Sequence, residues 1–333
     1  MRIVPSRSLG EAEFVAALAL QQRLDRERDP GLPVTPAAEL RAMFDNPVID
    51  FAHHHRVVAF DGCARALAVG HLELTFDTAN AKLATVEVTP ADDAATIAVL
   101  TELLRIARAD GRTSVIGWGD YSLERHIFWS GLGAELRYRE QEASLDMTAV
   151  DPCLMQQWLG IGSTCVDIHL VRWARHCPEE LIDVLVQTGN AINDAPIDTL
   201  EVADTIVDAA MLRAEIEERA ACGLEYQGIL AVTGDGAAVG ATEVFVNRHR
   251  PACSWQWNTV VLPAYRRRGI ARWMKAAMWR HLRETEPEVT MLHTGNAASN
   301  ASMRNINTEM GFTPTHTTGF WQADLQVLLN AAV

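Results

Sequence analysis

Three consecutive arginines, Arg266 to Arg268, are followed at once by Gly269 and, two positions later, by the small residue Ala271. They lie between a strand-like run that ends at Pro263 and a run with helical periodicity. The first N–H groups of a helix have no partner within it, and the helix dipole favours an anion there. A glycine lets a phosphate approach the backbone, and arginines add charge-assisted hydrogen bonds. The segment therefore predicts a phosphate or pyrophosphate site.

The alternative is an arginine-rich surface loop that only offsets nearby acidic charge. The position of the loop between a strand and an amphipathic helix favours a ligand instead. The segment contains neither GxxxxGK[ST] nor GxGxxG, so nucleotide hydrolysis and dinucleotide binding are both disfavoured. The whole chain has 29 Lys and Arg against 43 Asp and Glu, a formal net charge of −14. Such a chain repels nucleic acid, whereas an acidic pocket in it would favour a cationic partner such as an amine.

The length and composition indicate a soluble protein of two domains. A chain of 333 residues holds two domains at roughly 150 residues each. Its residues are 48% hydrophobic and 22% charged, which is typical of globular proteins. No uncharged apolar run approaches the ~18 residues of a membrane-spanning helix. Glu11 and Glu13 stand directly before the apolar run 14–20, unlike a signal peptide. We therefore expect a cytoplasmic protein with no membrane partner.

The six cysteines include no CxxC pair and are expected to be reduced thiols. Cys165, His169, His176 and Cys177 lie close together in sequence, but their spacing fits no standard zinc pattern. We therefore expect no metal site.

The elements that position the arginine loop form a series in the second half of the chain. Strand-like runs occupy 228–233, 238–246, 254–262 and 289–294, and helical periodicity occupies 269–283 and 298–309. The first half shows the same order, with strands at 56–60, 66–76, 83–88 and 114–118 and helices at 94–109 and 123–130. Each half then closes with strands, at 136–147 and 315–325.

The landmarks of the two halves also correspond. Val69-Gly70 matches Val239-Gly240, Pro90 matches Pro263, and Gly133 matches Gly311. A chance match of turn residues is the alternative, but the shared order of elements favours a duplication. This order predicts an α/β fold in each half, with a central mixed β-sheet flanked by helices. We expect domains at 1–150 and 164–333, joined by a linker at 151–163 that contains Asp-Pro and Gly-Ile-Gly.

The loop and the helix after it together resemble a known family. The run 266–271, Arg-Arg-Arg-Gly-Ile-Ala, resembles the [Q/R]xxGx[G/A] acetyl-coenzyme A loop of the GNAT acetyltransferases. The run from Asn296 through Asn300 to Gly311 and Phe312 resembles the NxxxN…GF helix of the same family. The whole stretch 256–312 is most similar to actinobacterial proteins that carry two GNAT domains in tandem.

The resemblance implies an N-acetyltransferase that takes its acetyl group from acetyl-coenzyme A and transfers it to the primary amine of a small molecule. It implies that the pantetheine arm pairs with the strand at Thr259, Val260 and Val261, like an added strand. It places the pyrophosphate on the loop residues Arg266, Arg267, Arg268, Gly269, Ile270 and Ala271, and Asn296, Asn300 and Met303 along the pantetheine. A main-chain N–H near Val260 or Val261 would polarise the acetyl carbonyl, and the amine would attack the thioester directly.

Such a reaction needs a base for the ammonium proton and an acid for the leaving thiolate. Family members often place a tyrosine four residues before the GF pair as that acid, and this sequence has Asn307 there. An asparagine can at most orient a water or the thiol, so the acid stays unassigned. Glu243 is the leading candidate for the base, because it alternates with apolar neighbours on a central strand. Lesser candidates are Tyr226, Glu225, His293 and His316, and a chain of waters is a further alternative.

The first half lacks the features of the loop. Aligning Pro90 with Pro263 sets Asp93 against Arg266 and Thr96 against Gly269. Carboxylates at this place would repel a pyrophosphate, so we expect one acetyl-coenzyme A for each chain, bound in the second half. The first half would complete the fold, wall the acceptor pocket or form the surface of a homodimer.

Two other functions remain open. One is a non-catalytic sensor that binds acyl-coenzyme A, which the absence of tyrosine at position 307 favours. The other is a biosynthetic acetyltransferase similar to mycothiol synthase, which also has tandem GNAT domains. The region 181–224 is expected to bear on acceptor choice and is rich in acidic residues. These residues form either a solvated helix face, which we favour, or an electronegative mouth for a cationic amine: Asp194, Asp198, Glu201, Asp204, Asp208, Glu215, Glu217 and Glu218.

Overall fold

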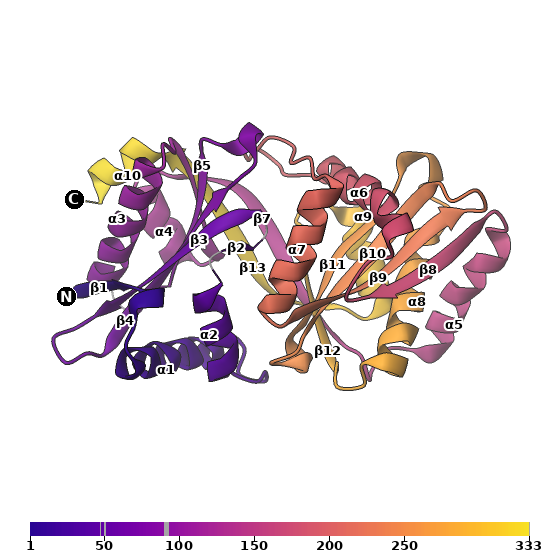
Figure 1. Cartoon of the computed structure of the whole chain (residues 1–333), viewed down its shortest axis with the longest axis horizontal. Helices are drawn as coiled ribbons and strands as arrows, with labels where there is room; N and C mark the ends of the chain where they lie inside the picture. Colours follow the sequence, from indigo (N-terminus) through magenta and orange to yellow (C-terminus); the bar gives the residue numbers. More distant parts are fainter. Residues whose placement is uncertain (47, 50, 90–92, 333) are drawn as a thin grey trace. The chain divides into compact units, whose positions relative to one another are not determined.

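The computed structural model of the chain describes residues 1–46, 48–49, 51–89 and 93–332 (Figure 1). The chain divides into two compact units of nearly equal size. The first unit comprises Met1–Glu140, Ile197–Asp204 and His316–Val333, and the second comprises Gln141–Pro196 and Thr205–Thr315. Each unit is an α/β fold built on one mixed sheet, as the order of strand and helix patterns predicts. None of the helices in the described residues is long and apolar enough to cross a membrane.

In the first unit the strands lie in the order β1-β3-β4-β5-β6-β13, and the short β2 pairs with β3. Their bounds are β1 Arg2–Pro5, β2 Val48–Ile49, β3 Ala52–Phe60, β4 Ala66–Thr75, β5 Leu83–Thr89, β6 Ser114–Asp120 and β13 Thr313–Asp324. The helices are α1 Glu11–Arg28, α2 Ala37–Asp45, α3 Asp93–Ala109, α4 Leu123–Gly131 and α10 Leu325–Ala331. Helix α3 buries Leu100 and Leu104 against one face of the sheet. Helices α1 and α2 cover the β1 end of the other face through Phe14 and Phe44.

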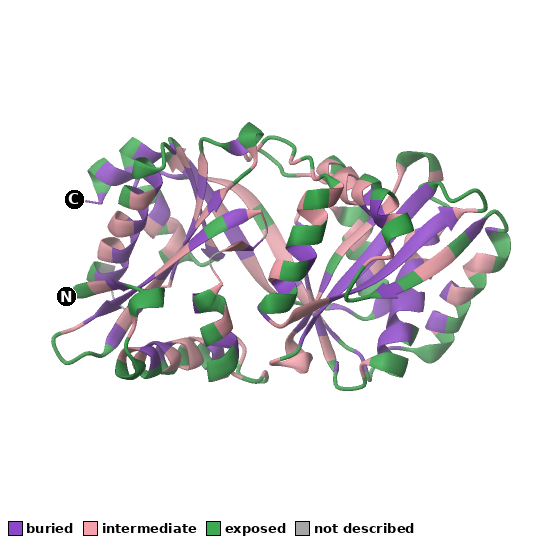
Figure 2. Cartoon of the chain, viewed as in Figure 1, coloured by how far each residue is buried: buried purple, intermediate pink, exposed green. Residues whose placement is uncertain are grey.

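In the second unit the order is β7-β12-β11-β10-β9-β8. The strands are β7 Glu135–Asp146, β8 Ile168–Ala174, β9 Leu224–Thr233, β10 Ala238–Asn247, β11 Ser254–Val261 and β12 Met291–Ala297. The helices are α5 Pro152–Gly160, α6 Ile182–Asn190, α7 Ala209–Ala221, α8 Ile270–Thr285 and α9 Ala301–Met310. Side chains of α5 and α8, such as Met155 and Met274, pack on one face of the sheet. Side chains of α6 and α7, such as Leu185 and Ile216, pack on the other. Figure 2 shows the resulting run of buried residues along β9 and β10.

The repeated order of elements is present in both units. The series β3-β4-β5-α3-β6-α4 of the first half matches β9-β10-β11-α8-β12-α9 of the second half. One landmark, Pro90, lies outside the described residues together with Ala91 and Asp92. The duplicated plan expected from the sequence is therefore the plan of the fold.

The final strands of the two halves are exchanged between the units. Strand β13, at the end of the second half, belongs to the first unit from His316 onward and pairs antiparallel with β6 from Thr318↔Asp120 to Asp324↔Ser114. Strand β7, at the end of the first half, enters the second unit at Gln141 and lies next to β12. The expected domains at 1–150 and 164–333 place β7 in the first domain and β13 in the second. In the structure β13 joins the sheet of the first unit, and β7 from Gln141 onward joins the sheet of the second unit.

The segment 151–163, expected to be a linker, instead forms α5 and the start of a short 3-10 helix. Asp151 caps α5 by accepting the backbone N–H of Cys153, and a proline stands at its first turn. Met155 is fully buried and Trp158 is 4% exposed in the core of the second unit. The Asp-Pro pair therefore marks the start of a helix.

Candidate functional site

The parallel strands β11 and β12 separate soon after they meet. They pair only at Ser254↔Leu292 and Trp255↔His293 in this part of the described chain, although β11 continues to Val261 and β12 to Ala297. The Thr294 hydroxyl then donates to the Gln256 carbonyl over 3.1 Å. Beyond that point the two facing edges diverge. The backbone groups along them are available for another extended chain.

The equivalent strands of the first unit stay together. Strands β5 and β6 pair without interruption from Leu83↔Ser114 to Glu87↔Trp118. Thr96, aligned with Gly269, is 1% exposed and lies inside α3, which begins at Asp93. Within its described residues, this unit therefore has neither diverging strands nor a left-handed residue at the aligned helix start.

A β-bulge lies where β11 leaves β12. The register between β10 and β11 shifts from Thr242↔Thr259 to Val244↔Gln256, so Trp257 and Asn258 together face Glu243. The Gln256 side chain donates to the Glu243 carbonyl over 2.8 Å and replaces the ladder bond that the bulge removes. The bulge therefore turns the edge of β11 and brings Asn258 to the carboxylate of Glu243, where the two form a side-chain hydrogen bond.

The backbone groups of β11 alternate between β10 and the opening beside β12. The Leu262 N–H donates to the Val239 carbonyl of β10 over 2.9 Å. Because backbone groups alternate along a strand, the Val260 N–H also points towards β10, and the N–H groups of Thr259 and Val261 point away from it. The Val261 carbonyl accepts a hydrogen bond from Arg266 Nε at 2.9 Å. Of the three residues expected along the pantetheine, Thr259 and Val261 thus direct their N–H groups into the opening.

The arginine loop has the backbone form of an anion site. Arg267 and Gly269 have φ of 64° and 79°, which is left-handed, and α8 begins at the next residue. Left-handed residues in such a turn help to direct neighbouring N–H groups to one side, as in the concave sites that bind phosphate. Arg268 lies 5.9 Å from the ring of Tyr265, and the side chains of all three arginines are exposed.

The remaining residues expected to bind the cofactor lie in two kinds of surroundings. Asn296 and Asn300 lie at the ends of β12 and α9, whereas Ile270 is buried in the core. The Asn307 side chain, 4% exposed on α9, donates to Asn296 Oδ1 on β12 over 2.7 Å. Asn307 Oδ1 has no hydrogen-bond partner in the described chain. Asn300 is the N-cap of α9, accepting the Met303 N–H at 3.2 Å. Ile270 is 1% exposed in the core, so only its backbone could contact a ligand.

Glu243 is 5% exposed on the face of the sheet that α6 and α7 cover. Burial raises its pKa to about 7, although the charge of Arg219 and the hydrogen bond from Asn258 act in the opposite direction. A carboxylate with this pKa can accept a proton at neutral pH.

The lesser candidates for the base lie in other surroundings. Tyr226 is buried beside Glu243, and burial raises its pKa well above the ordinary value. His293 stacks on Trp255, with ring centroids 6.2 Å apart. His316 belongs to the first unit, where it lies 3.5 Å from Asp120.

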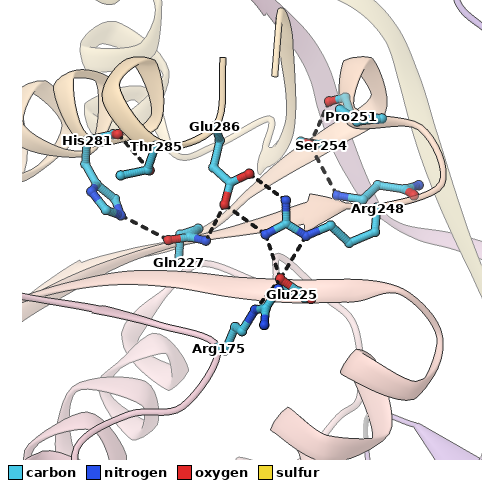
Figure 3. Close-up of polar contacts among 10 residues, drawn as sticks. Arg175, Glu225, Gln227, Arg248, Pro251, Ser254, His281, Thr285 and Glu286 are labelled. Atoms are coloured by element: carbon cyan, nitrogen blue, oxygen red, sulfur yellow. Dashed lines mark hydrogen bonds and ion pairs between the residues drawn. The ribbon is translucent and has the colours of Figure 1, made fainter. Parts of the chain in front are cut away.

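Glu225 is part of a polar network at the end of the sheet where β9 begins and α8 ends (Figure 3). Arg248 Nε and Arg175 Nε donate to Glu225 over 2.8 and 3.0 Å. Arg248 also forms a two-pronged contact with Glu286, at 2.5 and 2.8 Å. Figure 3 includes Gln227, which donates to Glu286 over 3.0 Å. Through Arg248, these hydrogen bonds connect the start of β9, the end of β10 and the end of α8. Glu225 therefore contributes to the packing of these elements.

The acidic residues of 181–224 do not all lie on a solvated face. Asp194, Asp198, Glu201, Asp204, Asp208 and Glu217 are exposed, and Glu218 is half-buried. Asp208 caps α7 by accepting the N–H groups of Ala210 and Met211. Glu215 departs from the pattern, being only 4% exposed. The sequence pattern of this acidic segment did not show that Glu215, rather than one of the other carboxylates, would be buried.

Residues 197–312 match the family model of the acetyltransferase (GNAT) family. That stretch contains the diverging strands, the bulge and the arginine loop. This part of the chain is therefore similar to a GNAT domain. The enzyme class of this family is N-acetyltransferase, and its members use acetyl-coenzyme A as cosubstrate. No curated protein matches the sequence of the chain.

Solved GNAT structures share the fold of the whole chain. A tandem GNAT protein from the clavulanic acid biosynthesis pathway superposes with a TM-score of 0.80 at 21% identity, covering 97% of this chain and 98% of that one. A GCN5-related N-acetyltransferase from Sphaerobacter thermophilus superposes with a TM-score of 0.64 at 12% identity, covering 97% and 96%. The fold of these structures therefore extends over both halves of the chain.

Proposed function

We propose that the second unit transfers the acetyl group of acetyl-coenzyme A to the primary amine of a small molecule. The separation of β11 from β12 is the observation that carries this proposal. An extended pantetheine arm could pair with the N–H and C=O groups of Thr259 and Val261, as a peptide adds to a sheet edge. The left-handed turn at Arg267 and Gly269 would then receive the pyrophosphate at the start of α8.

The same geometry supports direct transfer. A thioester in the opening beside β11 would have the Val261 N–H available where the oxyanion develops, and Glu243 would lie on the α7 side of the sheet. Glu243 would take the proton of the incoming ammonium, and the neutral amine would attack the carbonyl carbon. The uncommitted Oδ1 of Asn307 would orient the thiol or a water beside it.

The first unit is not expected to bind coenzyme A, because β5 and β6 stay paired from Leu83↔Ser114 to Glu87↔Trp118. One acetyl-coenzyme A per chain is therefore expected. Calorimetric titration with acetyl-coenzyme A measures this stoichiometry, and a value of two would contradict the proposal.

The loop is tested by Gly269→Glu, which adds a negative charge to the turn and places a Cβ 3.1 Å from the Ile161 side chain. Gly236→Glu is the matched control, because Gly236 has φ of 86° with open space around it, in a turn of the same unit. Both variants bear the strain of a side chain at positive φ, but only Gly269→Glu should lose acetyl-coenzyme A binding. Equal affinity in the two variants would refute the loop assignment.

A non-catalytic sensor of acyl-coenzyme A is the second candidate, and the asparagine at position 307 favours it. Release of free thiol from acetyl-coenzyme A in the presence of primary amines separates the two functions. Turnover identifies the transferase, whereas tight binding without turnover identifies the sensor.

A further inference from the structure

Helix α7 places an ion pair inside the second unit, beside Glu243. Glu215 and Arg219 on this helix are 4% and 6% exposed, and Arg219 Nε donates to Glu215 Oε1 over 2.6 Å. The Tyr226 hydroxyl donates to the same oxygen over 3.2 Å. The guanidinium of Arg219 also lies 4.0 Å from the centroid of the Phe245 ring. This arginine is therefore held in place on several sides.

Two carboxylates share this single buried cation. With both Glu215 and Glu243 ionised, the cluster would carry one uncompensated negative charge in a dry site, which is costly. With one of them protonated, its net charge is zero. The preferred state at neutral pH therefore has one proton on the pair. Burial raises the pKa of Glu215 to about 7, and the charge of Glu243 adds to that shift.

The other polar groups around the pair come from four neighbouring elements. They are Glu218 on α7, Tyr226 on β9, Asn258 on β11 and Cys177 after β8. Arg219 is the cation in closest contact with the carboxylates, and Glu218 adds a further carboxyl group on the same helix.

Two buried atoms beside the pair have no hydrogen-bond partner in the described chain. One is Glu215 Oε2, and the other is Trp173 Nε1. Trp173 pairs in register with Gly228, which in turn pairs with Glu243. A Cβ at Gly228 would stand 2.1 Å from the indole, so only glycine lets Trp173 lie across β9 here. The unmatched oxygen of Glu215 leaves this carboxyl group an atom that can carry the proton of the pair.

We propose that Glu215 is the second member of the proton-accepting site: it shares one proton with Glu243 across Arg219, and the pair selects an acceptor that arrives as an alkylammonium ion without a carboxylate. This inference rests on the proposed transferase function. Glu215 acts through Glu243 and is a positioning residue.

The protons balance through the reaction. An arriving ammonium ion brings a positive charge, so the pair releases its shared proton to solvent and both carboxylates ionise. The ammonium then gives a proton to Glu243, which restores the neutral cluster. The free amine forms the C–N bond as the C–S bond breaks, and the proton lost by the new amide nitrogen goes to the coenzyme A thiolate. The products are the N-acetyl amine, free coenzyme A and one proton.

The same charges determine the class of acceptor. An α-amino acid would bring its carboxylate towards Glu215, Glu243 and the acidic residues around them. The one cation of the cluster, Arg219, already bonds Glu215 and lies against Phe245. Repulsion therefore disfavours amino acids, whereas a simple alkylamine brings only the charge that the pair can neutralise.

The first test measures thiol release with two matched pairs of probes that differ by one carboxylate: 2-phenylethylamine against phenylalanine, and pentylamine against norleucine. We expect each amine to exceed its amino acid at least about tenfold in kcat/KM, since a like charge near the pair costs more than about 1.4 kcal/mol. A preference for the amino acids would overturn the acceptor class.

The second test compares Glu215→Gln with Glu217→Gln, an exposed glutamate on the same helix. With a neutral side chain at 215, Arg219 is left to Glu243 alone and favours its charged form, so the acidic limb of the kcat/KM profile should move to lower pH by roughly one unit. Glu217→Gln and the conservative Glu215→Asp should keep the wild-type limb. A purely structural Glu215 would lower the unfolding temperature and leave the limb in place, which would overturn the proposal.

Carboxyl 13C NMR of glutamate-labelled protein decides the proton sharing without turnover. Spectra of Glu215→Gln and Glu243→Gln assign the two signals, and in the wild type both should titrate in coupled steps near pH 7. Ionisation of both groups near the ordinary value of 4.5 would refute the sharing. If acetyl-coenzyme A binds and no amine turns over, the transfer function fails while this titration still decides the carboxylate pair.

Discussion

Arg266 Nε donates to the main-chain carbonyl of Val261 over 2.9 Å, so a loop arginine covers the edge of β11. The other end of its guanidinium pairs with Asp194 at 2.6 Å. The first arginine of the loop thus folds back on the strand, whereas a pyrophosphate would draw it towards the start of α8. The arrangement predicts competition between Asp194 and the phosphate for the same side chain.

Replacing Asp194 by asparagine should strengthen the binding of acetyl-coenzyme A. The ion pair is exposed, so its loss releases Arg266 at a gain of about 0.2–1 kcal/mol, or up to about fivefold in Kd. Calorimetric titration measures the change. Asp183→Asn, an exposed carboxylate on α6, is the control. An unchanged or weaker affinity in Asp194→Asn would show that Arg266 does not contribute to binding.

Replacing Asn307 by alanine should lower kcat about tenfold with little change in the KM for acetyl-coenzyme A. The substitution removes the 2.7 Å hydrogen bond to Asn296 and the uncommitted Oδ1, and about 1.4 kcal/mol lost in the transition state corresponds to tenfold in rate. Asn305→Ala on the exposed side of α9 controls for helix stability. Steady-state kinetics in which the two variants behave alike would remove Asn307 from the mechanism.

Replacing the buried Lys275 by methionine should stabilise the protein, most strongly below pH 7. Lys275 is 1% exposed on α8, 5.6 Å from the ring of Phe312, and burial lowers its pKa to about 7. The ordinary lysine pKa is 10.5, so between pH 7 and 10.5 the unfolded chain binds more protons and stability rises with pH. Below pH 7 the native state holds a buried charge.

Thermal unfolding from pH 6 to 9.5 checks this expectation. The difference in unfolding temperature between Lys275→Met and the wild type should be largest at pH 6 and should shrink as the pH rises. A constant difference would mean that Lys275 is not desolvated in the native state.

Replacing Arg248 by alanine should destabilise the second unit by about 2 kcal/mol at pH 7, because two partly buried carboxylates lose charge-assisted hydrogen bonds. Burial by itself would raise the pKa of Glu225, but the bonds and charges of Arg248 and Arg175 outweigh it and lower the pKa. The stabilisation is therefore present above the ordinary carboxyl pKa of 4.5 and is lost as the pH falls through the lower native value.

Urea unfolding at pH 7 and pH 3.5 measures the effect. The loss in Arg248→Ala should be smaller at pH 3.5, because below the ordinary pKa of 4.5 the stabilisation linked to Glu225 declines. Arg172→Ala is the control, because Arg172 pairs only loosely with Glu284, at 3.8 Å on an exposed surface. Equal losses in the two variants would mean that the network in Figure 3 adds no stability.

Local signals of the sequence were sufficient for the elements and for the loop. Alternation and helical periodicity located β9, β10, β11 and α8 to within a few residues, because such patterns reflect which side of an element faces the core. The arginines and Gly269 identified the turn, since a left-handed residue before a helix favours glycine. The bulge at Trp257 and Asn258 went unpredicted, because the extra residue is visible only against the register of β10.

The sequence by itself determined two copies of one plan and the chemistry of one loop, because periodicity, turn residues and charge act over a few positions. The tertiary structure decided which strand completes which sheet, since β7 and β13 have similar patterns and only long-range pairing distinguishes their partners. It also decided that β11 leaves β12 while β5 stays with β6. Of the eight acidic residues noted in 181–224, the tertiary structure buries Glu215 beside Arg219, because burial depends on what packs against a helix.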